Sequence, residues 1–183
     1  MPGSGKSVLS DYFTDKGYKF VRFGQITLDE VKRKDLKLNE KNERKVREDI
    51  RKKHGMAAHA ILNYPKFCKL LKKSHVIADG LYSWAEYKYL KSKFGEQMIV
   101  VAVYAPPKMR HIRISLRKMP KEDIDLRNRP FTIKEAKKRD YAEIEKLDKG
   151  GTIAMSDYTL VNTKSENYFI RQVAALHKEI HNR

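Results

Sequence analysis

Glycines, a lysine and a serine stand together at the start of the chain, in the run Gly3-Ser4-Gly5-Lys6-Ser7. The run matches the C-terminal part of the pattern G-x-x-x-x-G-K-[S/T]. Glycines let successive backbone N–H groups turn toward phosphate oxygens, and a following helix adds partial positive charge. Lys6 would bridge the β and γ phosphates, and Ser7 would ligate Mg²⁺. The five residues predict an ATP phosphate-binding loop (P-loop). A chance match in a flexible tail is less favoured, because an amphipathic helix follows at once.

The first glycine of the pattern, and the apolar strand that usually enters such a loop, have no counterpart before Gly3. A start assigned too late, a shortened chain and a fold that tolerates the gap are all open explanations. We expect strands near 75–80 and 98–104 to flank an empty position, with unpaired backbone groups. Roughly six to ten further residues, apolar and β-branched and ending in glycine, are expected upstream of Met1.

Asp79 ends the apolar run 75–80, HVIADG. A carboxylate at the end of a buried strand can hold Mg²⁺ through water. The alternative is a carboxylate that only accepts hydrogen bonds in the turn before Ser83. The metal role is favoured, so Ser7 and Asp79 are the predicted metal residues.

Positive side chains follow in the second half of the chain, and phosphoryl transfer requires such charge around the transferring group. Arg113 and Arg117 are four apart on one predicted helix, so they would share a face and clamp a base or phosphates. The polar, irregular segment 119–131 is predicted to be a mobile lid. For any single arginine a solvated surface charge is an equal alternative, but the group favours function. The candidate arginines are Arg113, Arg117, Arg127, Arg129 and Arg139.

The composition describes one soluble domain over residues 1–183. Hydrophobic residues make up 40% and charged residues 34%, with no apolar run near the roughly 20 residues of a membrane span. The single cysteine, Cys68, has no disulfide partner, and no leader is apparent, so we expect a cytoplasmic protein. The net charge of +17 allows a nucleic-acid partner, but a solvated, thermophile-like surface is favoured over one.

Helical and strand patterns alternate along the chain, which favours a three-layer α/β fold with a mostly parallel sheet. Three capping boxes are predicted to open helices, at 27–30, 83–86 and 132–135. Pro65 is predicted to interrupt or kink one helix. The expected helices cover 5–16, 39–54, a stretch from 56, 83–94, a stretch after 107, and 165–181; the expected strands cover 18–24, 75–80, 98–104 and 157–162.

With these residues in view, the chain resembles nucleoside monophosphate kinases and dephospho-CoA kinase. It is most similar to an archaeal P-loop nucleotide-kinase-like family related to adenylate kinase. The resemblance covers nearly the whole chain. It rests on MPGSGKS (1–7), VIADG (76–80), the Arg113-x-x-x-Arg117 pair, KKRDYAEIE (137–145) and SDYTLVNTKS (156–165).

The resemblance implies particular roles for individual residues. Arg113 would lie against the adenine, Arg117 and Arg139 would face phosphates, and the loop after Asn162 would approach the base. The helical region 25–73 would bind the acceptor. Two departures bear on the acceptor: Gln25 stands where such kinases usually have an acidic residue, and Leu81-Tyr82 stand where an arginine is usual.

The favoured prediction is a Mg-ATP-binding phosphotransferase that moves the γ-phosphate to a small phosphorylated acceptor. No membrane partner is expected. Lys6, Arg117, Arg127, Arg129 and Arg139 would act in the transfer. One alternative is an ATP-dependent regulatory or nucleic-acid-associated protein, which the charge favours. Another is a degenerate scaffold that binds no nucleotide, which the missing strand favours. The acceptor, the choice of ATP over GTP and the oligomeric state are left open.

Overall fold

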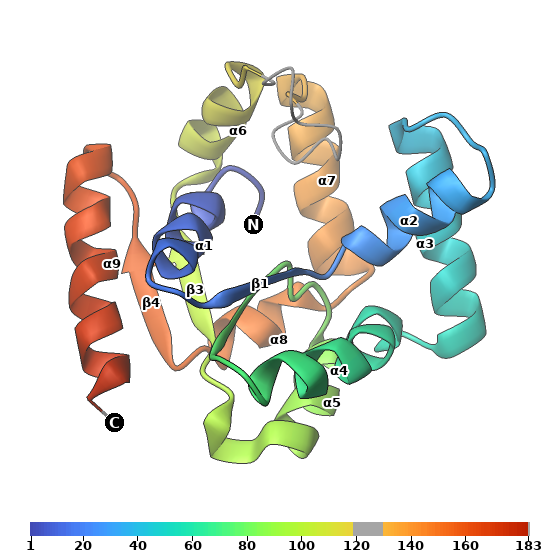
Figure 1. Cartoon of the computed structure of the whole chain (residues 1–183). Helices are drawn as coiled ribbons and strands as arrows, with labels where there is room; N and C mark the ends of the chain where they lie inside the picture. The colour runs from blue at the N-terminus through green and yellow to red at the C-terminus, as the bar shows by residue number, and fades with distance from the viewer. Residues whose placement is uncertain (119–129, 183) are drawn as a thin grey trace.

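The fold alternates helices with short strands, as the computed structural model shows for residues 1–118 and 130–182 (Figure 1). The lid segment, with Arg127 and Arg129, lies outside these residues except for Pro130 and Phe131. No helix in the described part of the chain is long and apolar enough to cross a membrane. The elements are α1 (Lys6–Asp15), β1 (Lys19–Arg22), α2 (Gln25–Arg33), α3 (Glu40–His54), α4 (Ala58–Leu71), β2 (Val76–Asp79), α5 (Trp84–Phe94), the 3₁₀ turn η1 (Gly95–Gln97), β3 (Val101–Tyr104), α6 (Pro107–Ser115), α7 (Ile133–Glu145), α8 (Lys149–Ala154), β4 (Tyr158–Val161) and α9 (Glu166–His181).

The described strands form two parallel pairs. β1 pairs with β2, with Arg22 opposite Asp79, and β3 pairs with β4, with Tyr104 opposite Val161. The predicted α/β class with parallel strands is confirmed, but among the described residues β2 and β3 do not pair with each other. The two strands that were expected to flank an empty position are therefore not paired directly in the described part of the chain.

The described core has two clusters, one on each strand pair. Leu9 and Phe13 of α1 and Phe169 of α9 pack with Val103 and Leu160 of the β3–β4 pair. A second cluster, on the β1–β2 pair, contains Val21, Phe23, Ala60, Phe67 and Leu90. Helix α1 also contacts β2, so it bridges the two pairs (Figure 1).

Side-chain caps begin several of the helices, because a free backbone N–H in the first turn needs an acceptor. Asn39 accepts from the Asn42 backbone N–H at the start of α3. Complete capping boxes begin α5, with Ser83 and Glu86, and α7, with Thr132 and Glu135, as predicted.

The capping box predicted at 27–30 is wrong. Helix α2 begins at Gln25, after Gly24, and Thr27 lies inside it. The Thr27 hydroxyl bonds instead to Nε2 of His59, at 3.0 Å in the interior. The Thr27 side chain therefore bonds to a buried residue that is distant in the sequence and does not cap the backbone of its own helix.

Three further predictions need correction. Helix α6 ends at Ser115, so Arg117 lies beyond it and shares no helical face with Arg113. Helix α4 continues through Pro65 without interruption. Of the strand predicted over 98–104, only Val101–Tyr104 (β3) is a strand. Residues 98–100 connect it to the turn η1.

Candidate functional site

The loop before α1 requires glycine at two positions. Gly3 has φ +76° and Gly5 has φ +108°, values that residues with a side chain rarely adopt. A Cβ on Gly3 would lie 2.5 Å from the Arg110 carbonyl oxygen, and one on Gly5 would lie 2.3 Å from Asn162 Nδ2. The sequence therefore folds here into a tight turn that leads directly into the helix N-terminus, a geometry suited to an anion.

Lys6 lies at the mouth of this loop and shares a cavity lining with Asp79. Its ammonium donates to the Met1 carbonyl oxygen at 2.9 Å. Burial lowers the pKa of Lys6 to about 8, against the opposing effect of the nearby Asp79 carboxylate. A desolvated ammonium with few fixed anionic partners is suited to attract the charge of a polyphosphate.

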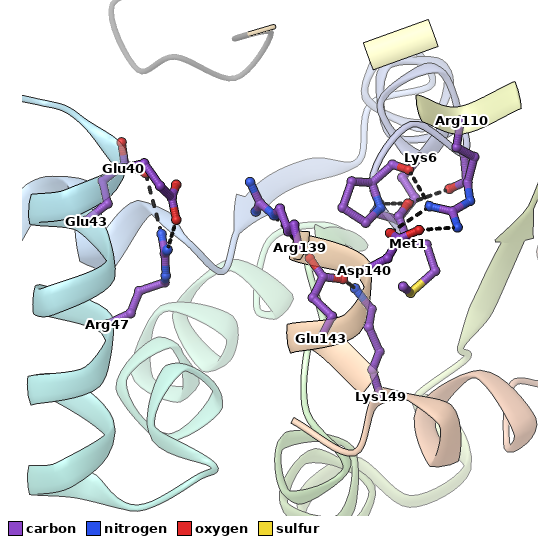
Figure 2. A network of polar contacts seen from close by, with 12 residues as sticks. Met1, Lys6, Glu40, Glu43, Arg47, Arg110, Arg139, Asp140, Glu143 and Lys149 are labelled. Atoms are coloured by element: carbon purple, nitrogen blue, oxygen red, sulfur yellow. Dashed lines mark hydrogen bonds and ion pairs between the residues drawn. The ribbon is translucent and has the colours of Figure 1, made fainter. Parts of the chain in front are cut away.

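A buried ion cluster connects the loop before α1 to α6 and α7 (Figure 2). Asp140 of α7 accepts from Arg110 at 2.6 and 2.9 Å and from His111 at 2.8 Å. Arg110 also donates to the carbonyl oxygens of Ala105 and Pro2, each at 3.0 Å. Burial opposes the charge of Asp140, but the Arg110 and His111 bonds outweigh it and keep its pKa low. One side chain, Arg110, thus joins the loop, the end of β3 and α7.

A second buried cluster lies beside Lys6. Glu143 pairs with Lys149 and, at 3.3 Å, with Arg139 (Figure 2). Burial raises the pKa of Glu143, but the charges of Lys149 and Arg139 outweigh this and bring it to about 2. The Lys149 ammonium also lies 4.7 Å from the centre of the Tyr82 ring. The cluster places two more cations close to the loop.

Asn162 and Arg113 meet at the other side of the loop. The Asn162 side-chain amide donates to the Ser4 carbonyl oxygen at 2.9 Å, in the interior. Arg113 donates to the Asn162 carbonyl oxygen, also at 2.9 Å. The loop after β4 therefore contacts the phosphate-binding loop, and the structure brings together these two residues that were expected to lie near the base.

The structure brings most of the predicted site residues to one end of the strands. Gly3, Ser4, Gly5, Lys6 and Ser7 form the loop and the first turn of α1. Asp79 ends β2 and lines the same cavity as Lys6, and the charge of Arg139 of α7 acts on the Lys6 ammonium, whose pKa it helps to lower. Arg117 lies after the end of α6, apart from the predicted pairing with Arg113.

Sequence reasoning missed Arg110, Asp140, Glu143 and Lys149. The first two are 30 residues apart, and no spacing rule connects them. Asp140 and Glu143 did lie in the stretch KKRDYAEIE (137–145) that carried the family resemblance, but no role was predicted for them.

No group of three His, Cys, Asp or Glu side chains suited to a metal ion occurs in residues 1–118 and 130–182. A phosphate-binding loop does not require such a group. Mg²⁺ in these sites is bound by one or two protein ligands together with the nucleotide phosphates. The Ser7 hydroxyl in the first turn of α1 and the Asp79 carboxylate at the end of β2 fit that donor set.

Comparisons with known proteins give one family match and several similar archaeal proteins. The profile of the AAA domain family matches residues 1–146. A UPF0200 protein of Thermococcus kodakarensis is 35% identical over 182 residues, which cover 98% of this chain and 94% of the relative. A UPF0200 protein of Thermococcus onnurineus is 34% identical with the same coverage. A UPF0200/UPF0201 protein of Archaeoglobus fulgidus is 32% identical over 94% of this chain and 51% of its own length.

Proposed function

Because the chain belongs to the UPF0200 family of archaeal P-loop proteins and carries an AAA domain, a nucleotide-binding domain, we propose that it is a Mg-ATP-dependent phosphotransferase. It moves the γ-phosphate to a small phosphorylated acceptor. The observation that carries the proposal is the desolvated Lys6 ammonium between the glycine loop and Asp79, with Arg139 and Lys149 beside it.

The proposed mechanism consists of positioning and charge neutralisation. The loop N–H groups and Lys6 hold the β and γ phosphates, while Arg113 and Asn162 border the base. Ser7 and Asp79 hold Mg²⁺, which neutralises phosphate charge when bound. Arg139 and Lys149 offer positive charge to the group in transfer, with Arg117, Arg127 and Arg129 proposed to add to it.

A thermal-shift measurement tests the metal role of Asp79. Mg²⁺ is expected to strengthen ATP binding by the wild-type chain. With Mg²⁺ present, the ATP affinity of Asp79→Asn is expected to be about tenfold lower than that of the wild type. Binding of ATP in the presence of a chelator is expected to change little. Asp15→Asn, at the exposed end of α1, serves as the control. An Asp79→Asn chain that keeps the full Mg²⁺ dependence contradicts the proposed role.

Arg51 of α3 is the side chain that we propose for holding the acceptor. It is half-buried, and its Nε atom is buried without a hydrogen-bond partner among the described residues. Burial lowers its pKa, and the charge of Arg47 adds to this effect. The charge of Glu86 opposes this lowering most strongly, and the charges of Tyr82 and Glu143 oppose it as well. A guanidinium can bind a phosphate through two parallel hydrogen bonds, and the Arg51 Nε–H is a donor without a protein acceptor among the described residues.

Arg51→Gln is expected to raise the KM for the acceptor by about 10- to 100-fold, the effect of losing a buried charge-assisted contact. The affinity for ATP is expected to stay unchanged. Arg44→Gln is the matched control, because Arg44 lies on the same helix but is exposed and pairs with Glu48. Equal acceptor KM values for the two variants would exclude Arg51 from the acceptor site.

The transfer itself is tested by offering labelled ATP with nucleoside monophosphates, dephospho-CoA and related phosphorylated compounds. We expect label on at least one of them, and none with Lys6→Ala. The second candidate is an ATP-dependent nucleic-acid-associated protein, favoured by the net charge of +17. Salt-sensitive RNA or DNA binding that depends on ATP, without transfer to any small acceptor, favours that candidate instead.

A further inference from the structure

Three helices that pack in sequence, α3 on α4 and α4 on α5, each carry a polar side chain with an unpaired atom in the interior. These side chains are Arg51 of α3, His59 of α4 and Glu86 of α5. Glu86 is 0% exposed and His59 is 1% exposed, and His59 Nδ1 lies 3.6 Å from Glu86 Oε1. Arg51 Nε, His59 Nδ1 and Glu86 Oε1 are all buried without a hydrogen-bond partner among the described residues. Such atoms cost free energy, so a reason for keeping them is needed.

The two oxygens of the Glu86 carboxylate have different surroundings. Oε2 accepts from the backbone N–H groups of Tyr82 and Ser83, at 2.9 and 3.1 Å, and completes the capping box of α5. Capping therefore leaves Oε1 unused. Burial raises the pKa of Glu86, and the two backbone bonds, followed by the charge of Arg51, oppose this rise. A carboxylate in this interior needs a cation nearby to remain charged.

Arg51 is the cation available to the Glu86 carboxylate. His59 is neutral at pH 7, because burial, followed by the charge of Arg51, lowers its pKa to about 4. Lys149 also acts on Glu86, but it pairs with Glu143. In the other direction, Glu86 is the group whose charge most strongly opposes the lowered pKa of Arg51. The two side chains thus attract each other through the interior, where charges interact more strongly than in water.

We infer that Glu86 is a positioning residue for Arg51: its unused carboxylate oxygen attracts the guanidinium and holds it ready for the phosphate of the acceptor. The inference rests on the proposed function, in which Arg51 binds the acceptor. An arginine side chain loses much rotamer freedom when it is ordered by a ligand. An anion that is already fixed in a capping box orders the side chain before the acceptor arrives, so the acceptor binds more tightly.

Glu86→Gln is the variant that tests this role, because glutamine keeps the shape and the capping bonds of glutamate and removes the charge. Glu135→Gln is the matched control, since Glu135 holds the same place in the capping box of α7. Glu86→Gln is expected to raise the acceptor KM about tenfold, with kcat and the KM for ATP within about twofold of the wild type. An equal rise in both variants would assign the effect to capping and overturn the inference.

A double-mutant cycle shows whether Glu86 acts through Arg51. In an Arg51→Gln chain, the further change Glu86→Gln is expected to alter the acceptor KM by less than about twofold, because the side chain to be positioned is gone. If the effects of the two substitutions multiply, Glu86 does not act through Arg51.

Nuclear magnetic resonance of the Arg51 Nε–H group gives a readout that needs no acceptor, and Arg51→Gln identifies its signal. The order parameter of this N–H bond is expected to fall from about 0.8 in the wild type to below about 0.6 in Glu86→Gln, and to stay unchanged in Glu135→Gln. The same order in the wild type and Glu86→Gln would contradict the positioning role. Transfer of phosphate to no acceptor would contradict the proposed function, while this measurement would still decide whether Glu86 holds Arg51.

Discussion

Replacing Lys6 with alanine is expected to remove most of the affinity for Mg-ATP. Its ammonium is a charge-assisted donor in a desolvated place, and such contacts contribute about 1.5–3 kcal/mol, or 10- to 150-fold in affinity. The fold is expected to persist, since Lys6 bonds only to the Met1 carbonyl among the described contacts. Calorimetric titration with Mg-ATP measures the loss. Lys16→Ala is the control, because Lys16 is exposed at the far end of α1.

The lowered pKa of Lys6 gives the same prediction a pH dependence. At pH 7 the amine is mostly protonated, and above its pKa of about 8 the free protein loses the charge that phosphate binding needs. ATP affinity of the wild-type chain is therefore expected to fall roughly tenfold from pH 7 to pH 9. Lys6→Ala is expected to lack this slope. If the variant binds ATP as tightly as the wild type, the phosphate-binding loop is not the nucleotide site.

Replacing Asp140 with alanine is expected to lower the free energy of unfolding by about 3–5 kcal/mol, the usual cost of leaving buried charges without their partner. Arg110 is 4% exposed and His111 is 6% exposed, so water cannot replace the lost carboxylate. Because Arg110 holds the Pro2 carbonyl, the loop is expected to lose its shape as well. Urea unfolding of the variant measures the loss of stability.

Two controls isolate the role of Asp140. Glu145→Ala removes an exposed carboxylate from the same helix and is expected to change stability by less than about 0.5 kcal/mol. The pKa of Asp140 is lowered by folding, so its contribution is complete above the ordinary value near 3.8 and declines as the pH falls below it. The gap between wild type and Asp140→Ala should therefore narrow in acid. A stable Asp140→Ala chain at pH 7 would show that Arg110 and His111 have other support.

The local features of this protein were readable from its sequence. Gly3 and Gly5 have the positive φ values that their residue type allows, and Lys6 begins the helix that follows. Capping boxes at Ser83 and Thr132 begin helices as predicted, since their partners lie three residues away. Patterns of this kind are decided by short-range sterics and hydrogen bonds, which the neighbouring residues already contain.

Contacts between distant segments were decided only by the tertiary structure. The hydroxyl of Thr27 bonds to His59 rather than capping α2, because burial offered it a partner 32 residues away. Helix α6 ends at Ser115, so Arg113 and Arg117 do not share the helical face that their spacing of four residues predicted.

The sequence also did not predict which charged side chains would be buried and which of those would be paired. Asp140 became the support of Arg110, 30 residues away, while Arg51 kept a buried Nε without a partner in the described chain. In a sequence with 40 lysines and arginines, type and spacing look alike for solvated and functional cations. Burial separates them, because a desolvated charge must be paired or be available to a ligand, and only the packing of distant helices decides which charges lose their water.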